Sequence, residues 1–171
     1  NLSDQAFELN NPTTHGAVTF GAAAFGIATV NLAHAIDLNP GAGSDARQSI
    51  TLNNGQRALI GLQWDSPFFS SVPNDLDLFL VDQTNNELVA VSSADNISND
   101  EPVEVLGFTN STGSARTYEI IVDRFSGPMP TKLKWVNFGA NNSGPINTIE
   151  YDTNSPTVIP HSAAVGAMSI G

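Results

Sequence analysis

Cysteine is absent from this 171-residue sequence. Its absence excludes a disulfide framework and any zinc site built on thiolates, while the redox compartment stays open. Basic residues are also scarce, because six Lys and Arg stand against 17 Asp and Glu, for a formal net charge of -11. This charge repels nucleic-acid phosphates and anionic lipid surfaces alike, so neither nucleic acid nor membrane is expected as a partner.

Long hydrophobic runs are missing as well. No stretch approaches the roughly 20 apolar residues that a transmembrane helix needs. The apolar fraction of 40% is still too high for a disordered chain, so a soluble globular protein is expected. The start at Asn1 has neither an initiator Met nor an apolar leader, which predicts a processed or excised piece.

The middle of the chain consists of short alternating runs separated by turn residues, a pattern typical of strands. The turn Asn53-Asn54-Gly55 between RQSITL and RALIGLQW predicts a hairpin. A second hairpin is predicted from DLDLFLVD and LVAVSS, which flank Thr84-Asn85-Asn86. Further strands are predicted in VEVLGFT (103–109), RTYEIIVDRF (116–125), TKLKWVNF (131–138) and INTIEY (146–151).

About eight strands with no long helical pattern between them predict an all-β fold, an antiparallel jelly-roll β-sandwich. We divide the chain into an Ala/Gly-rich N-terminal flanking segment (1–36), the sandwich (37–151) and a C-terminal segment (152–171). The flanking segment lacks clean alternation and fits either a helix or a buried strand. The expected core residues are Ile60, Leu62, Leu76, Leu78, Leu80, Val89, Val103, Val105, Tyr118, Ile120, Val122, Leu133 and Trp135.

Four runs, taken in order, resemble a jelly-roll domain embedded in certain large bacterial subtilisin-like serine proteases. They are LQWDSPF (62–68), NDLDLFLVD (74–82), NDEPVEVLGFTNSTGSARTYEIIVDRFSG (99–127) and YDTNSPTVIPHSAAVGAMSIG (151–171). The same block, roughly residues 45–171, is more distantly similar to prepeptidase C-terminal domains and convertase P domains. Within the last run, TVIPHSAAVGAMSIG resembles a strand of the subtilase core.

This resemblance implies a non-catalytic domain of a secreted bacterial protease, which stabilises the enzyme or positions its substrate. The implied partners are the protease catalytic domain of the parent chain and a protein or polysaccharide substrate. The sequence contains no Gly-Thr-Ser-Met-Ala, Asp-Thr-Gly or His-Gly-Thr-His motif, so the catalytic triad of that family lies outside it and no catalytic residue is assigned.

Two other functions remain open. An exposed row of aromatic side chains would favour a free-standing module that binds carbohydrate or a cell-surface polymer. A histidine near a serine and a carboxylate would favour a small hydrolase, although His15, His34 and His161 all lie in the Ala-rich ends. By strand parity Trp64 and Trp135 point inward, which favours core packing over a sugar-stacking platform.

Asp75, Asp77 and Asp100 form the candidate calcium site. Asp75 and Asp77 share one strand face, where side chains two positions apart lie roughly 7 Å from each other. Calcium takes about 6 to 8 oxygen ligands, which two carboxylates and the acidic loop around Asp100 could supply. The loop lacks the Gly and Glu of an EF-hand. Alternatively, Asp75 and Asp77 accept backbone N–H bonds and organise the strand edge.

Overall fold

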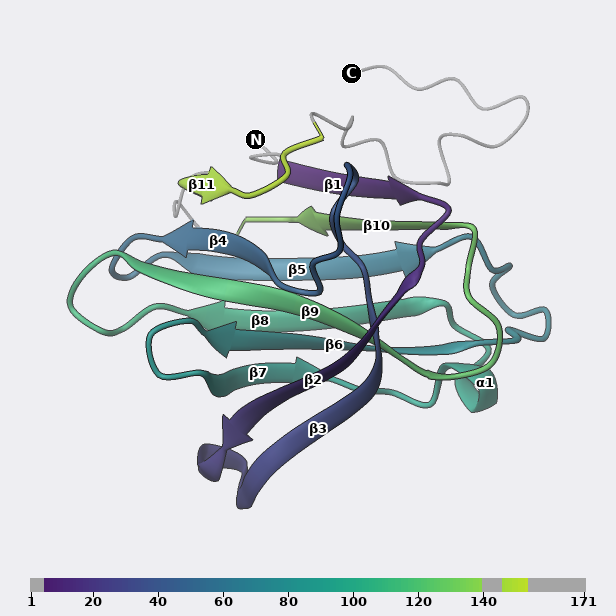
Figure 1. Ribbon diagram of the computed structural model, residues 1–171, viewed down its shortest axis with the longest axis horizontal. Helices are drawn as coiled ribbons and strands as arrows, with labels where there is room; N and C mark the ends of the chain where they lie inside the picture. Colours follow the sequence, from purple (N-terminus) through teal and green to yellow (C-terminus); the bar gives the residue numbers. More distant parts are fainter. Residues whose placement is uncertain (1–4, 140–145, 154–171) are drawn as a thin grey trace.

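The protein is an all-β sandwich of two packed sheets in a computed structural model that describes residues 5–139 and 146–153 (Figure 1). Within those residues, the helical turns are η1 (Ala23–Phe25) and α1 (Asn96–Asn99), and neither is long and apolar enough to cross a membrane. The strands are β1 (Gln5–Asn10), β2 (Thr14–Ala22), β3 (Ile27–Ile36), β4 (Gln48–Leu52), β5 (Arg57–Trp64), β6 (Asp75–Asp82), β7 (Glu87–Ser92), β8 (Val103–Thr109), β9 (Arg116–Ser126), β10 (Lys132–Asn137) and β11 (Thr148–Ile149).

One sheet has four strands in the order β1-β10-β5-β8, with every neighbouring pair antiparallel. The other sheet has seven strands. Its main body runs from β11 through β4 and β9 to β6 and β7, again antiparallel. The hairpin of β2 and β3 completes this sheet, because Ala35 pairs with Asp123 of β9 and Gly21 pairs with Glu87 of β7.

The main core lies between the two sheets. Most of the expected core residues are buried there, including Leu62, Leu78, Ile120 and Trp135, each with no exposed surface. Both tryptophans point inward, as predicted, and each indole meets a buried amide. Trp135 Nε1 donates to Gln48 Oε1 at 2.7 Å, and Trp64 Nε1 donates to Asn74 Oδ1 at 2.7 Å.

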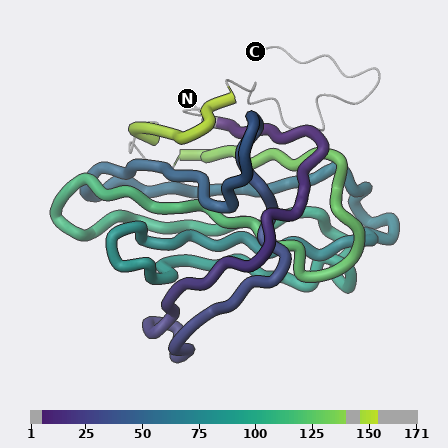
Figure 2. Tube along the Cα trace, in the orientation of Figure 1, coloured from purple at the N-terminus to yellow at the C-terminus, as the bar shows by residue number. Residues whose placement is uncertain are grey.

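A second core lies on the outer face of the seven-stranded sheet, where the β2–β3 hairpin crosses β6 and β9 obliquely (Figure 2). Phe20 of the hairpin meets Phe79 of β6 with ring centroids 5.6 Å apart. Ile121 of β9 is buried in the same cluster. The strands β6 and β9 therefore bury side chains on both faces, which removes this sheet face from solvent.

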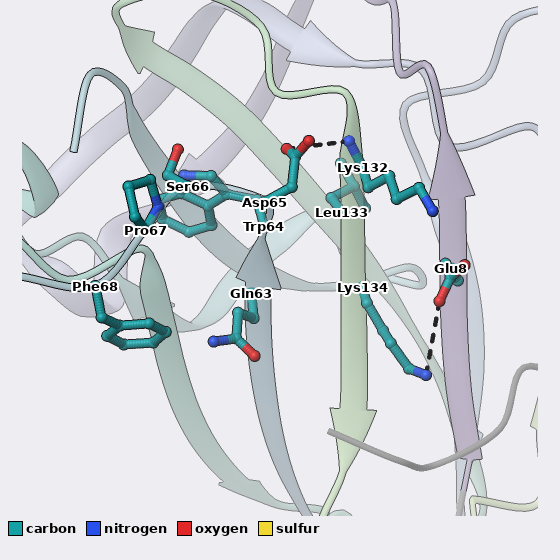
Figure 3. A pocket seen from close by; sticks show the side chains of 10 residues that line it. All are labelled: Glu8, Gln63, Trp64, Asp65, Ser66, Pro67, Phe68, Lys132, Leu133 and Lys134. Carbon is teal, nitrogen blue, oxygen red and sulfur yellow. Dashed lines mark hydrogen bonds and ion pairs between the residues drawn. The ribbon is translucent and has the colours of Figure 1, made fainter. Parts of the chain in front are cut away.

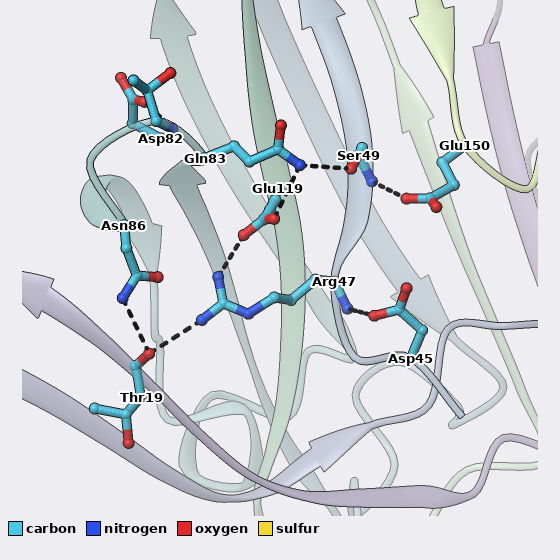
Figure 4. A network of polar contacts seen from close by, with 10 residues as sticks. Thr19, Asp45, Arg47, Ser49, Asp82, Gln83, Asn86, Glu119 and Glu150 are labelled. Atoms are coloured by element: carbon cyan, nitrogen blue, oxygen red, sulfur yellow. Dashed lines mark hydrogen bonds and ion pairs between the residues drawn. The ribbon is translucent and has the colours of Figure 1, made fainter. Parts of the chain in front are cut away.

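A polar network fixes the hairpin at its border with β9 and the β6–β7 turn (Figure 4). The Arg47 guanidinium forms an ion pair with Glu119 of β9 and donates to the Thr19 carbonyl of β2 at 3.0 Å. Gln83 Nε2 donates to the other Glu119 oxygen at 3.2 Å, and Asn86 Nδ2 donates to the same Thr19 carbonyl at 3.4 Å. Because Glu119 is largely buried, losing Arg47 would leave a desolvated carboxylate.

The hairpin predicted around Asn53-Asn54-Gly55 is wrong, whereas the β6–β7 hairpin is confirmed. The strand β4 lies in the seven-stranded sheet and β5 in the four-stranded sheet, so this turn crosses from one sheet to the other. Alternation cannot distinguish the two arrangements, because both place the same side chains in one core.

The expected core position of Val105 is also wrong, since its side chain is 53% exposed on the outer face of the four-stranded sheet. The neighbouring Glu104 points inward instead. Its carboxylate accepts the Ala94 N–H at 2.9 Å and the Asn96 amide at 3.0 Å, and it is hydrogen-bonded to the Ser92 hydroxyl. These hydrogen bonds stabilise the buried carboxylate. They also determine that Glu104 faces inward on β8 and its neighbour Val105 outward.

The described part of the segment set apart as residues 1–36 is mostly strand, with the turn η1 between β2 and β3. The strand β1 pairs with β10 along its whole length, and β2 and β3 form the covering hairpin. Of the segment 152–171, residues Asp152 and Thr153 are described, and Thr153 Oγ1 accepts the Glu8 N–H at 3.2 Å. The proposed subtilase-like strand lies outside the described residues.

Replacing Gln48 with leucine should test the polar contact across the main core. The buried Gln48 amide accepts from Trp135 and donates to the Glu150 carbonyl at 2.8 Å, so Gln48→Leu leaves two groups unpaired. We expect the free energy of unfolding in urea to fall by about 2 to 4 kcal/mol. Gln63→Leu, on the outer face, should stay within about 0.5 kcal/mol of the parent. Equal stability of Gln48→Leu and the parent would contradict this role.

Candidate binding site

The outer face of the four-stranded sheet is hollowed by two adjoining pockets of about 500 and 250 Å³. Gln63, Phe68 and Lys134 line both pockets, so the two form one groove that runs across the strands. Their combined size is in the range of small-molecule and oligomer sites. We call this feature the outer groove.

Strand alternation builds the polar side of the outer groove (Figure 3). Leu133 and Trp135 of β10 are buried in the core, so Lys132 and Lys134 extend from the opposite face. The same alternation turns Gln63 of β5 outward. On the neighbouring β1, the Glu8 carboxylate lies 3.7 Å from the Lys134 ammonium.

Aromatic and aliphatic side chains build the remainder. The ring of Phe68 forms a wall after the end of β5 and lies against Phe69, with centroids 6.0 Å apart. Phe69 is 73% exposed. The ring of Phe138 lies over Gly61, where an added Cβ would come within 2.6 Å of it. The exposed Val105 side chain extends this apolar surface over β8.

Asp65 fixes the loop that carries Phe68 to the start of β10. Its carboxylate accepts the N–H groups of Thr131 at 3.0 Å and Lys132 at 3.2 Å, and it is hydrogen-bonded to the Thr131 hydroxyl. Partial burial acts to raise the pKa of Asp65, but these hydrogen bonds outweigh it and leave the pKa below its usual value. The groove wall is therefore held by an ionised carboxylate at neutral pH.

The predicted calcium ligands Asp75, Asp77 and Asp100 do not form one site. Asp75 and Asp77 line a pocket with Asp95, whereas Asp100 accepts the Val72 N–H at 2.8 Å and ends α1. Asp75 accepts the Asn96 N–H at 3.3 Å, as in the alternative role of organising the strand edge. Among the described residues, no group of three or more acidic, histidine or cysteine side chains is placed to hold a metal ion.

Asp77 instead belongs to a cluster of half-buried and buried carboxylates. Burial, followed by the charges of Asp75, Glu104 and Asp123, raises the pKa of Asp77 to about 7. Asp123 lies directly opposite Asp77 on β9 and accepts the His34 N–H at 3.0 Å. Burial also raises the pKa values of Asp75, Glu104 and Asp123. The cluster thus favours the protonated form of Asp77 near neutral pH.

The described histidines give no support to a hydrolase. His15 lines a pocket with Asp45 and Thr19, but the Thr19 hydroxyl donates to Asn31 Oδ1 at 2.8 Å. This arrangement does not pair a nucleophile with a base at His15. His34 is exposed on β3, and His161 lies outside the described residues.

The outer groove was not predicted from the sequence. The core positions expected for Leu133 and Trp135 imply that Lys132 and Lys134 lie on the opposite face of the strand, as they do, but the sequence gives that face no role. The available signal was the run Pro67-Phe68-Phe69 directly after a predicted strand, because consecutive aromatic residues in a loop point to an exposed apolar surface.

The raised pKa of Asp77 predicts how stability changes with pH. Between about pH 4 and pH 7 the folded state binds more protons than the unfolded state, so the free energy of unfolding should fall as the pH rises through this range. Asp77→Asn should flatten this dependence and raise stability at pH 8 by about 1 kcal/mol, a figure reduced for partial solvent screening.

Calorimetric melting between pH 5 and pH 8 measures this effect, and Asp65→Asn is the matched control. The pKa of Asp65 is lowered, so its contribution is present at neutral pH and lost on acidification, and the control should be less stable than the parent at pH 7. If the stability of Asp77→Asn changes with pH as that of the parent does, ionisation of Asp77 does not destabilise the fold.

Comparison with known proteins assigns the chain to no family. No family model matches the chain, and no curated protein matches it significantly. Function is therefore inferred from the side chains that the fold brings to the surface, above all from the outer groove.

Proposed function

We propose that this chain is a non-catalytic jelly-roll domain that binds a polysaccharide in the outer groove. The groove carries this proposal, because it joins a phenylalanine wall to hydrogen-bonding side chains on a sheet face that no other described strand covers. A sugar ring offers C–H groups to an aromatic face and hydroxyls to amide and carboxylate groups, so Phe68, Gln63 and Glu8 match its chemistry.

The strand order supports the jelly-roll assignment. With the β2–β3 hairpin and β11 set aside, eight strands remain, namely β1, β4, β5, β6, β7, β8, β9 and β10, which we count from first to eighth in that order. In the four-stranded sheet, β1-β10-β5-β8, the first strand pairs with the eighth, the eighth with the third and the third with the sixth. In the other sheet, β4 pairs with β9, β9 with β6 and β6 with β7, so the second strand pairs with the seventh, the seventh with the fourth and the fourth with the fifth. This order is that of two interleaved Greek keys, with the hairpin as an insertion after the first strand.

A second proposal concerns context, namely that the domain belongs to a secreted bacterial subtilisin-like protease and acts beside its catalytic domain. The run LQWDSPF (62–68) favours it, because this part of the resemblance supplies the groove wall and Asp65. In that context the groove would hold the polymer on which the protease works, and the chain itself would perform no catalysis.

Truncation of Phe68 tests the binding proposal. In affinity electrophoresis through gels that contain soluble polysaccharides, the parent chain should be retarded by at least one polymer, and Phe68→Ala should lose most of the retardation. The expected loss is about tenfold in affinity, because one stacked ring contributes roughly 1 to 1.5 kcal/mol.

Phe125→Ala is the matched control, since Phe125 is 68% exposed on β9 of the other sheet and should not affect binding. Free migration of the parent chain in every polymer gel, or an equal loss in both variants, would contradict a polysaccharide site in the outer groove.

A further inference from the structure

Charge is distributed unequally between the two sheets. The strands of the seven-stranded sheet hold six carboxylates and two arginines, whereas those of the four-stranded sheet hold three basic residues and two acidic ones. One of those two acidic residues, Glu104, faces the core. In a chain of net charge -11, the outer face of the four-stranded sheet thus carries more basic than acidic side chains, even when Asp65 of the groove wall is counted with Glu8.

Both lysines of the sequence line the outer groove. The Lys134 side chain is only 12% exposed, so its stem lies along the groove floor and its ammonium is held 3.7 Å from Glu8. Lys132 is exposed, and its ammonium forms no ion pair with a carboxylate in the part of the chain that the structure describes. The groove therefore presents one anchored and one available ammonium on the side of Glu8, with Gln63 between them and Phe68 (Figure 3).

We propose that the ligand of the outer groove is an anionic polysaccharide whose sugar rings carry carboxylates, a polyuronate. This inference rests on the proposed function and adds the ligand class. The ammonium of Lys132 pairs with a uronate carboxylate, and a neighbouring ring of the same polymer lies against Phe68. A hydrogen bond to a charged group contributes more binding free energy than one between neutral groups. The carboxylate should therefore make the groove bind acidic sugars more tightly than neutral ones.

The acceptors of the groove favour an acidic sugar over an acidic peptide. Glu8 is 34% exposed at its side chain, and Gln63 offers an amide oxygen beside it. Sugar hydroxyls can donate to both groups from the same ring that carries the carboxylate, whereas in an acidic peptide the side chains that carry the charge have no donors of their own when ionised. A uronate ring carries an anion and several hydroxyls together, and the groove holds partners for both kinds of group.

The test compares polygalacturonate with its methyl ester, which keeps the sugar backbone and removes the charge. Titration calorimetry of the full chain should give an affinity for polygalacturonate at least about tenfold above that for the ester, falling as salt rises. Lys132→Gln should reduce the affinity for polygalacturonate about tenfold and leave ester binding unchanged, and Lys132→Arg should retain most of it.

Arg124→Gln, which removes a positive charge from the other sheet, should bind polygalacturonate as the parent does. Circular dichroism melting of each variant verifies folding, and the exposed Lys132 position should tolerate substitution. Equal binding of polymer and ester would overturn the ligand class and keep the proposed function. Binding of neither, nor of any neutral polysaccharide, would overturn both. Equal binding of polyglutamate, or an equal loss in Arg124→Gln, would show nonspecific charge attraction and overturn the inference.

Discussion

The burial of β6 and β9 on both faces is the constraint on which the rest of the molecule depends. One face of these strands packs against the four-stranded sheet, and the other lies beneath the β2–β3 hairpin, with Phe79 and Ile121 in the second core. Such strands must be apolar on both sides, as FLV in β6 and IIV in β9 are. The hairpin in turn needs the Arg47–Glu119 pair to hold its border with β9.

This constraint assigns the two sheets different roles. Burial raises the pKa values of Asp77 and Asp123 on the doubly covered strands, and the charges of Asp75, Glu104 and Asp123 raise the pKa of Asp77 further. Within residues 5–139 and 146–153, no hairpin lies over the four-stranded sheet, so its outer face keeps side chains that can meet a ligand. Both sheets contribute to the main core, the hairpin adds a second core to the seven-stranded sheet, and the proposed binding belongs to the four-stranded sheet.

Much of the sandwich can be predicted from sequence, because alternation reports which side chains share a face. It correctly gives the limits of β5 and β6 and the inward positions of Trp64 and Trp135. It does not report which sheet a strand joins, so the Asn53-Asn54-Gly55 turn was assigned to a hairpin. The inward position of Glu104 depends on donors outside its own strand, in the connection between β7 and β8, and the groove depends on strand pairings between β1, β10 and β5. Local sequence contains neither.

The outer groove is the proposed ligand site, and it lies on the sheet face opposite the one that packs in the main core. A crystal structure of the chain with a bound oligogalacturonate tests this claim most directly. We predict sugar rings over Gln63, between Phe68 and the ammonium groups of Lys132 and Lys134. Sugar density at the acidic pocket beside Asp75, or along the β2–β3 hairpin, with none in the outer groove, would contradict it.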